Sequence, residues 1–215
     1  MSGLTAAAQR ELEALWRLEF PNGGSAEQIR DFLMEVLPLV GQNYGDAAAA
    51  LAAAWFENAR ERASAPGAFS AVLAPDVTPK RWEALARWGV DPLFKAEPDA
   101  ASALSLVKGG LQRTVADQHR VTIARSAIAD PAAKGWKRVG VGDSCDFCAK
   151  LLGRGAVYTT SSVRFRSHDN CNCAAAPAWN TKVVDISHVN DDFTPSTRFR
   201  SDEARRANSR ALRDY

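Results

Sequence analysis

The chain has 215 residues, of which 46% are apolar, and a formal net charge of +2. This length and apolar content allow one large domain or two small ones with a real core, whereas the small net charge gives no case for general affinity for nucleic acid. The apolar runs end well short of the ~20 residues that a membrane helix needs. Because no secretion signal is visible either, we expect a soluble product of the cytoplasm.

The first part of the chain predicts helices separated by glycine and proline. Residues 4–20 follow the spacing of an amphipathic helix, and 21–24 (Pro-Asn-Gly-Gly) stop it. Ser25 then opens a second helix, with Gln28 completing a capping box. We expect Pro38 and Gly41 to interrupt or kink this helix.

Three further helices are expected before residue 131. Asp46 can cap an alanine-rich helix that runs to about residue 63, with Trp55 and Phe56 as its buried anchors. Thr78 followed by proline predicts a helix over 79–88. The longest helical signal covers 99–129. On it Leu104, Val107, Leu111 and Val115 form the apolar face, and Gly109 and Gly110 weaken the helix locally. Arg113, Asp117, His119 and Arg120 are predicted to face away from the core, with His119 at a solvent-facing rim.

From Pro131 the composition changes, and 131–186 reads as a small α+β unit. Short strands are expected at 137–141, 156–160, 163–166, 174–179 and 182–186, with one helical turn at 146–152. The unit has too little apolar mass to stand alone, so a metal staple would stabilise it. The predicted fold class is therefore α+β: a mostly helical region 1–130, a zinc-stapled module 131–186 and a polar, arginine-rich tail 187–215.

All four cysteines and one of the three histidines lie in two close-spaced clusters of this module. Cys145 and Cys148 form a C-x-x-C, and after nineteen intervening residues His168, Cys171 and Cys173 form an H-x-x-C-x-C. Thiol and imidazole groups at such spacing, with a loop between the clusters, are typical of a structural Zn²⁺ site.

Two alternatives remain open for these residues. The cysteines could form disulfides, although these are rare in a reducing cytosol. For zinc, five candidate ligands compete for four positions. If 171–173 were extended, Cys171 and Cys173 would point to opposite faces and only one would reach the ion easily. A tight turn could instead bring both inward and leave His168 outside the first set of ligands.

The same region resembles a known family. The segments that carry the resemblance are 135–139 (GWKRV), 145–152 (CDFCAKLL), 154–158 (RGAVY), 168–173 (HDNCNC) and Pro177. Together they are similar to the C-terminal signature of MuF-like minor capsid (head morphogenesis) proteins of tailed phages and prophages, especially those of actinobacterial hosts. The match covers about a fifth of the chain.

The resemblance implies a structural minor capsid protein of the virion, present in the host cytoplasm during assembly, with the portal or the major capsid protein as partner. We expect no enzymatic activity, because five candidate ligands suffice to close the zinc site and no glutamate lies between Cys145 and Pro177. His119 and His188 lie in no catalytic motif, and the deaminase pattern is absent. The alternatives are a capsid maturation protease and a zinc-ribbon nucleic-acid-binding protein.

Two features suggest contact surfaces. The tail 198–215 holds six arginines against three acidic residues, and it could contact an acidic capsid surface or packaged DNA. These arginines are Arg198, Arg200, Arg205, Arg206, Arg210 and Arg213. The helical region also contains Trp16, Trp55, Trp82 and Trp88, more than one small core needs, so at least one is expected to face a partner.

Overall fold

The computed structural model describes residues 2–140, 148, 151–156, 158–159, 165, 167–171 and 173–179. The chain divides into two compact units, Met1–Val184 and Asp185–Tyr215, and every described residue belongs to the first. Its elements, in order, are α1 (Ser2–Glu19), α2 (Ala26–Arg62), α3 (Pro79–Gly89), the 3₁₀ helix η1 (Asp91–Phe94), α4 (Ala100–Ala129), β1 (Trp136–Val139) and β2 (Ala174–Pro177).

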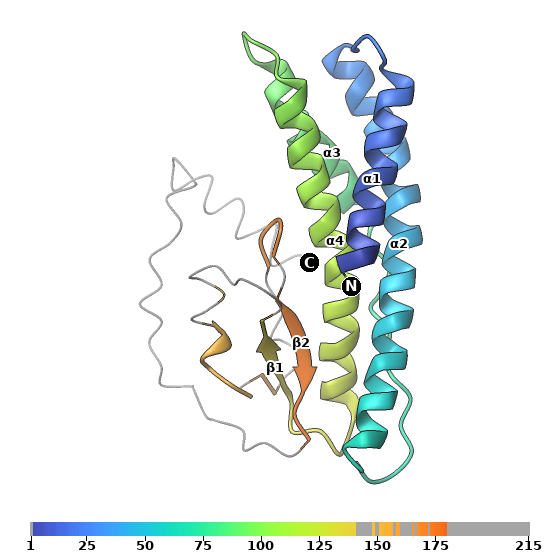
Figure 1. Ribbon diagram of the computed structural model, residues 1–215, viewed down its shortest axis with the longest axis vertical. Coiled ribbons are helices and arrows are strands. Elements are labelled where there is room, and N and C mark those ends of the chain that lie inside the picture. Colours follow the sequence, from blue (N-terminus) through green and yellow to red (C-terminus); the bar gives the residue numbers. More distant parts are fainter. Residues whose placement is uncertain are drawn as a thin grey trace. The chain divides into compact units, whose positions relative to one another are not determined.

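Two long helices, α2 and α4, run side by side in the same direction and form the centre of the described part (Figure 1). Their C-terminal ends meet where Arg60 pairs with Asp130. Helices α1 and α3 run in the opposite direction, and each packs against both α2 and α4. None of the described helices is long and apolar enough to cross a membrane.

Helix α2 corrects the prediction of two separate helices around Pro38. It continues without a break from Ala26 to Arg62 with Pro38 inside it, and Asp46 lies within the helix rather than at a cap. There Asp46 accepts a hydrogen bond from Gln42 one turn earlier, at 2.7 Å. An interior proline costs about 3 kcal/mol. Burial of the apolar stripe on both sides of it, from Leu33 to Phe56, is large enough to outweigh that cost.

The other predicted helix starts and ends hold to within a residue or two. Ser25 and Gln28 form the predicted capping box. Thr78 precedes α3 with Pro79 in the first turn, although its side chain makes no capping hydrogen bond. Asp99 caps α4 by accepting from the Ser102 amide at 2.9 Å. Within 2–130, all of which is described, no strand occurs, as predicted.

The bundle core is apolar and closely packed. Leu12, Leu37, Trp82 and Leu111 belong to one continuous cluster of buried side chains. Gly41 is necessary for this packing, since a Cβ there would lie 2.1–2.7 Å from the indole ring of Trp82. Gly41, which was predicted to interrupt or kink the helix, is therefore the position where Trp82 of α3 packs closely on α2.

The prediction that both Trp55 and Phe56 are buried anchors is wrong for Trp55. Phe56 is fully buried, but its neighbour Trp55 is 42% exposed. The two side chains point about 100° apart around the helix, so Phe56 packs against Phe69 and Trp179 while Trp55 is half-exposed.

The small sheet packs against α4. Strands β1 and β2 pair antiparallel, with Trp136 opposite Pro177 and Val139 opposite Ala174, and Tyr158 adds a single bridge to Trp136. They correspond to the strands predicted at 137–141 and 174–179. Of the strand predicted at 156–160, residues 156, 158 and 159 are described, and among them only the bridge at Tyr158 is β structure. The strand predicted at 163–166 is described at Phe165 alone, and 182–186 lies outside the described residues.

Candidate metal centre

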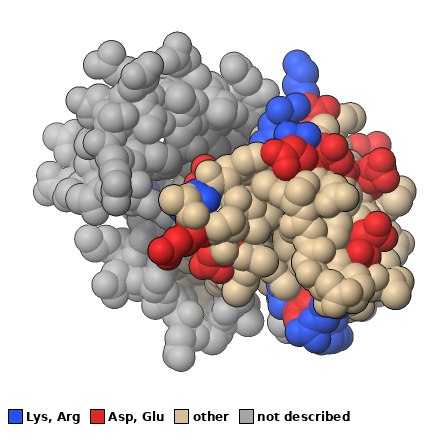
Figure 2. Space-filling view, turned by 90° about the horizontal axis from the view of Figure 1, so that it is seen from above, with Lys and Arg blue, Asp and Glu red and all other residues tan. Residues whose placement is uncertain are grey.

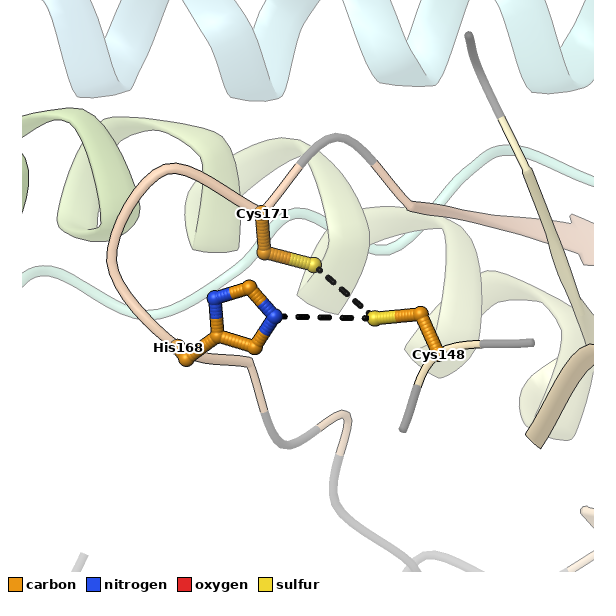
Figure 3. Close-up of side chains that lie close together, drawn as sticks. All are labelled: Cys148, His168 and Cys171. Atoms are coloured by element: carbon orange, nitrogen blue, oxygen red, sulfur yellow. Dashed lines mark hydrogen bonds between the residues drawn. The ribbon is translucent and has the colours of Figure 1, made fainter. Parts of the chain in front are cut away.

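Three of the five predicted ligands come together in the structure. The Sγ atoms of Cys148 and Cys171 and a ring nitrogen of His168 all lie within 4.8 Å of one another (Figure 3). Cys148 Sγ is 3.6 Å from Cys171 Sγ and 3.8 Å from His168 Nε2. Two atoms bound tetrahedrally to one Zn²⁺ at the usual bond lengths would lie about 3.6–3.8 Å apart. The three side chains therefore have a spacing that can hold a metal ion.

A tight turn brings His168 and Cys171 to the same side. The Cys171 amide donates to the His168 carbonyl at 3.2 Å, which closes a four-residue turn. Asn170, at its third position, has a φ of +61°. Asparagine is one of the few residues other than glycine that adopt this left-handed backbone readily. Cys148 reaches the group from a separate segment, where its backbone is helical.

The imidazole of His168 is oriented for binding through Nε2. Its Nδ1 lies 2.7 Å from the carbonyl oxygen of Asp169. A carbonyl can only accept, so Nδ1 carries the proton and Nε2 presents its lone pair toward Cys148 (Figure 3). A ligand histidine that donates its second N–H to a backbone carbonyl is a common feature of metal sites.

The chemistry of the group also fits a metal better than a disulfide. A disulfide requires sulfur atoms about 2.05 Å apart, and those of Cys148 and Cys171 are 3.6 Å apart. Two thiols and one imidazole are a donor set that suits Zn²⁺. Both cysteines are buried, which shields the thiols from solvent.

The other two predicted ligands are Cys145 and Cys173. Cys145 lies outside the described residues. Cys173 is described and buried, but it is not one of the three residues that the structure brings within 4.8 Å. Its carbonyl oxygen accepts a hydrogen bond from Arg120 of α4.

Helix α4 supports the turn with Arg113, Asp117 and Arg120, which were expected to face away from the core, and with Gln112, a residue that the sequence pattern did not single out. Arg120 is 0% exposed and Gln112 only 7% exposed, and both contact the backbone of 170–173. Arg113 forms an ion pair with Asp169, and Asp117 accepts from Ser167. Polar residues spaced by three and four along a helix are also typical of a solvated face, so no sequence pattern distinguishes a solvated face from one that binds the backbone of a turn.

His119 is half-buried, which is compatible with the rim position expected for it. Burial lowers the pKa of its imidazole to about 4, so the ring is neutral at pH 7. His188 lies outside the described residues, as does the whole arginine-rich tail.

Comparisons with known proteins give one family. No curated protein and no solved structure matches the chain. A family model described as "VG15 protein" matches residues 1–194, which is most of the chain. The match spans the helical bundle and all three residues of the candidate metal group. The chain therefore belongs to the VG15 protein family, a family of phage proteins.

Proposed function

We propose that this protein is a structural minor capsid protein of a tailed phage or prophage, acting without catalysis in head assembly at the portal or the inner capsid surface. The family match over residues 1–194 carries the proposal, since it makes a phage role the starting point. The MuF-like motifs around the cysteines then favour the head over other phage structures.

The metal group supports this proposal as a structural Zn²⁺ site. Cys148, His168 and Cys171 would hold the ion, with Cys145 or Cys173 as the fourth ligand. When bound, zinc would supply no chemistry beyond crosslinking the segment of Cys148 to the turn of 168–171. Such a crosslink stabilises a small unit that cannot build a large core.

The surface of the helical part offers possible contacts to a protein partner. Trp16 and Trp82 are buried, whereas Trp55 and Trp88 are 42% and 43% exposed. Tryptophan is favoured at the centres of protein interfaces. The two exposed indoles are therefore our candidates for anchors on the portal or the capsid wall.

The charge distribution gives less support to the nucleic-acid-binding alternative. Figure 2 shows one face of the described part, on which basic side chains lie in separate groups among acidic ones and uncharged residues fill much of the area. A nucleic-acid-binding surface is normally a continuous basic patch or stripe. A contact to packaged DNA, if made, would come from the arginines of the tail.

Mass spectrometry of purified virions tests the proposal. We expect this chain in mature heads, at few copies beside the major capsid protein. Deletion of 198–215 should reduce its incorporation, and the contact made by the tail should weaken as the salt concentration rises.

Two outcomes would replace this proposal. Absence of the chain from mature heads, together with cleavage of the capsid protein that depends on it, would establish the protease alternative. Tight binding of the purified protein to nonspecific duplex DNA, without incorporation into particles, would favour the nucleic-acid-binding one.

A further inference from the structure

The turn of 168–171, which we call the metal-binding turn, is held by side chains of α4 that contact the backbone of the turn and of Cys173. Arg120 donates from Nη2 to the carbonyl of Cys171 at 2.5 Å and from Nε to the carbonyl of Cys173 at 2.8 Å. One planar guanidinium thus fixes two alternate peptides of the segment that contains the ligand Cys171. Because its donors form a rigid fork, this contact fixes orientation as well as distance.

Gln112, two turns earlier on α4, contacts the same segment at two successive residues, Asn170 and Cys171. Its Oε1 accepts from the amide of Asn170 at 3.0 Å, and its Nε2 donates to the carbonyl of Cys171 at 3.4 Å. The side-chain amide therefore replaces the backbone partners that a strand would supply. Gln112 thus gives hydrogen-bond partners to two backbone groups that lie on either side of the 170–171 peptide, whose own N–H is bonded to the His168 carbonyl.

The edges of the turn are also tied to α4. Asp117 accepts at 2.8 Å from Ser167, which precedes His168, and at 2.8 Å from Arg120. Arg113 Nη1 lies 3.0 Å from Asp169 Oδ1. Gly109 allows this closeness, since a Cβ there would lie 3.2 Å from Cβ of Asp169.

From these contacts we infer that Gln112 and Arg120 are positioning residues of the metal centre, which hold Cys171 and His168 in the geometry that the ion needs. This inference rests on the proposed metal site. A buried guanidinium without partners is costly, so the folded helix itself requires the turn to lie where its carbonyls meet Arg120. The metal site is thereby prepared by α4 before the ion arrives, instead of being formed by the ion alone.

Gln112→Leu provides the test, since it removes both hydrogen bonds while keeping a side chain of similar size. Thr122→Val is the matched control. Thr122 is also fully buried on α4, and its Oγ1 accepts from a different loop, at the amide of Ala74 (2.9 Å). Each substitution removes a contact between α4 and a loop, but only one of the loops carries metal ligands.

The measurements are the dissociation constant for Zn²⁺, by competition with a chromophoric chelator, and the visible spectrum of the Co²⁺-loaded full-length protein. Loss of a group that orients a metal ligand typically weakens metal binding 10–100-fold. We expect that range for Gln112→Leu, with a changed Co²⁺ spectrum, and a dissociation constant and spectrum like wild type for Thr122→Val. Arg120→Lys keeps the positive charge but loses the fork, and should also weaken binding.

The possible results distinguish failure of the positioning role from failure of the proposed metal site. If wild-type protein binds Zn²⁺ and Gln112→Leu binds it as tightly with the same Co²⁺ spectrum, the positioning role is overturned while the metal site stands. If Thr122→Val weakens binding as much as Gln112→Leu, the effect is one of general stability and the inference also fails. If wild-type protein binds neither ion, the proposed metal site itself is wrong and the positioning role falls with it.

Discussion

The two faces of α4 are held to their neighbours by different forces. Toward α2 and the other helices, Val107, Leu111 and Val115 belong to one apolar core. Toward the turn of 168–171, which carries two of the candidate ligands, the same helix presents Gln112 and Arg120, which contact backbone amides and carbonyls. Apolar contact is not directional, so it stabilises the bundle without fixing every atom. Hydrogen bonds to peptides are directional and set the position of the turn closely.

The difference follows from what each region has to bury. The helices share a large apolar surface, whereas the module after Pro131 has short strands and few large apolar side chains. Three of its described aromatic residues form one small stack, Trp136 with Tyr158 and Phe165, whereas Trp179 packs against Phe56 of α2. Polar contacts and a metal ion are means of fixing such a unit in place. The bundle is therefore stabilised by its own apolar core, whereas the described part of the module is held by polar contacts to α4, and the proposed metal ion would add to them.

The largest expected effect comes from removing a metal ligand. Structural zinc sites in small peptides have apparent binding free energies on the order of 10–16 kcal/mol. Cys148→Ser, or chelation of the wild-type protein, should therefore abolish metal binding and increase hydrogen exchange over 136–179, while α1 and α2 remain protected. Elemental analysis and hydrogen exchange with mass spectrometry would measure this.

The same assay identifies the fourth ligand. Cys145→Ser and Cys173→Ser should differ, and the one that loses the metal supplies the remaining ligand. Full metal content in Cys148→Ser would show that the described group does not hold the ion.

The next largest effect tests the apolar core of the helical bundle. Trp82 is buried against Gly41, so Trp82→Ala should lower the free energy of unfolding by about 3–5 kcal/mol. Urea denaturation followed by circular dichroism would measure it. Trp55→Ala is the control, because removal of a half-exposed side chain should change stability by about 0.5 kcal/mol or less. Equal losses in both variants would mean that Trp55 contributes to the core after all.

A third effect concerns the buried polar contact at Asp130, which joins α2 to Trp179 shortly after β2. Arg60 donates to Asp130, which also accepts from the indole N–H of Trp179 at 2.8 Å. Asp130→Asn leaves the guanidinium without its buried counter-charge. It should cost about 3 kcal/mol at neutral pH, measured by urea denaturation.

The pH dependence of this cost has a definite sign. Burial raises the pKa of Asp130, but the hydrogen bonds from Arg60, Trp179 and the amide of Ala132 lower it more, so the net pKa lies below its usual 3.8. A lowered native pKa stabilises the fold fully above the usual value, and this contribution is lost as the pH falls through the native pKa. The difference between wild type and Asp130→Asn should therefore be constant near neutrality and shrink below about pH 4. A difference that grows on acidification would contradict the assigned ion pair.

The smallest effect tests the backbone of the metal-binding turn. Asn170 has a φ of +61°, so Asn170→Ala should cost about 1–2 kcal/mol, whereas Asn170→Gly should be close to neutral. Thermal denaturation of the metal-loaded variants would measure this difference. Equal stability of the two variants would show that the turn adopts another backbone in solution.

Local signals were enough to predict most of the helices. The capping box at Ser25, the proline at the start of α3 and the cap at Asp99 all act within one helical turn, so they can be recognised without knowledge of the fold. The break expected near Pro38 was wrong because long-range packing of α2 decides whether an interior proline is tolerated. The spacing of cysteine and histidine likewise predicted the candidate site, because ligand type and separation follow from the coordination chemistry of zinc.

The sequence by itself thus determined the helical class of the first 130 residues, the candidate ligands and the membership of a phage family. Only the tertiary structure decided which ligands meet, since this depends on a left-handed Asn170 that places His168 and Cys171 on one side of a turn. It also decided that Arg120 is buried beneath that turn instead of being solvated. An arginine on a helix is compatible with either environment, and its partners here are carbonyl groups more than fifty residues away, which no local pattern encodes.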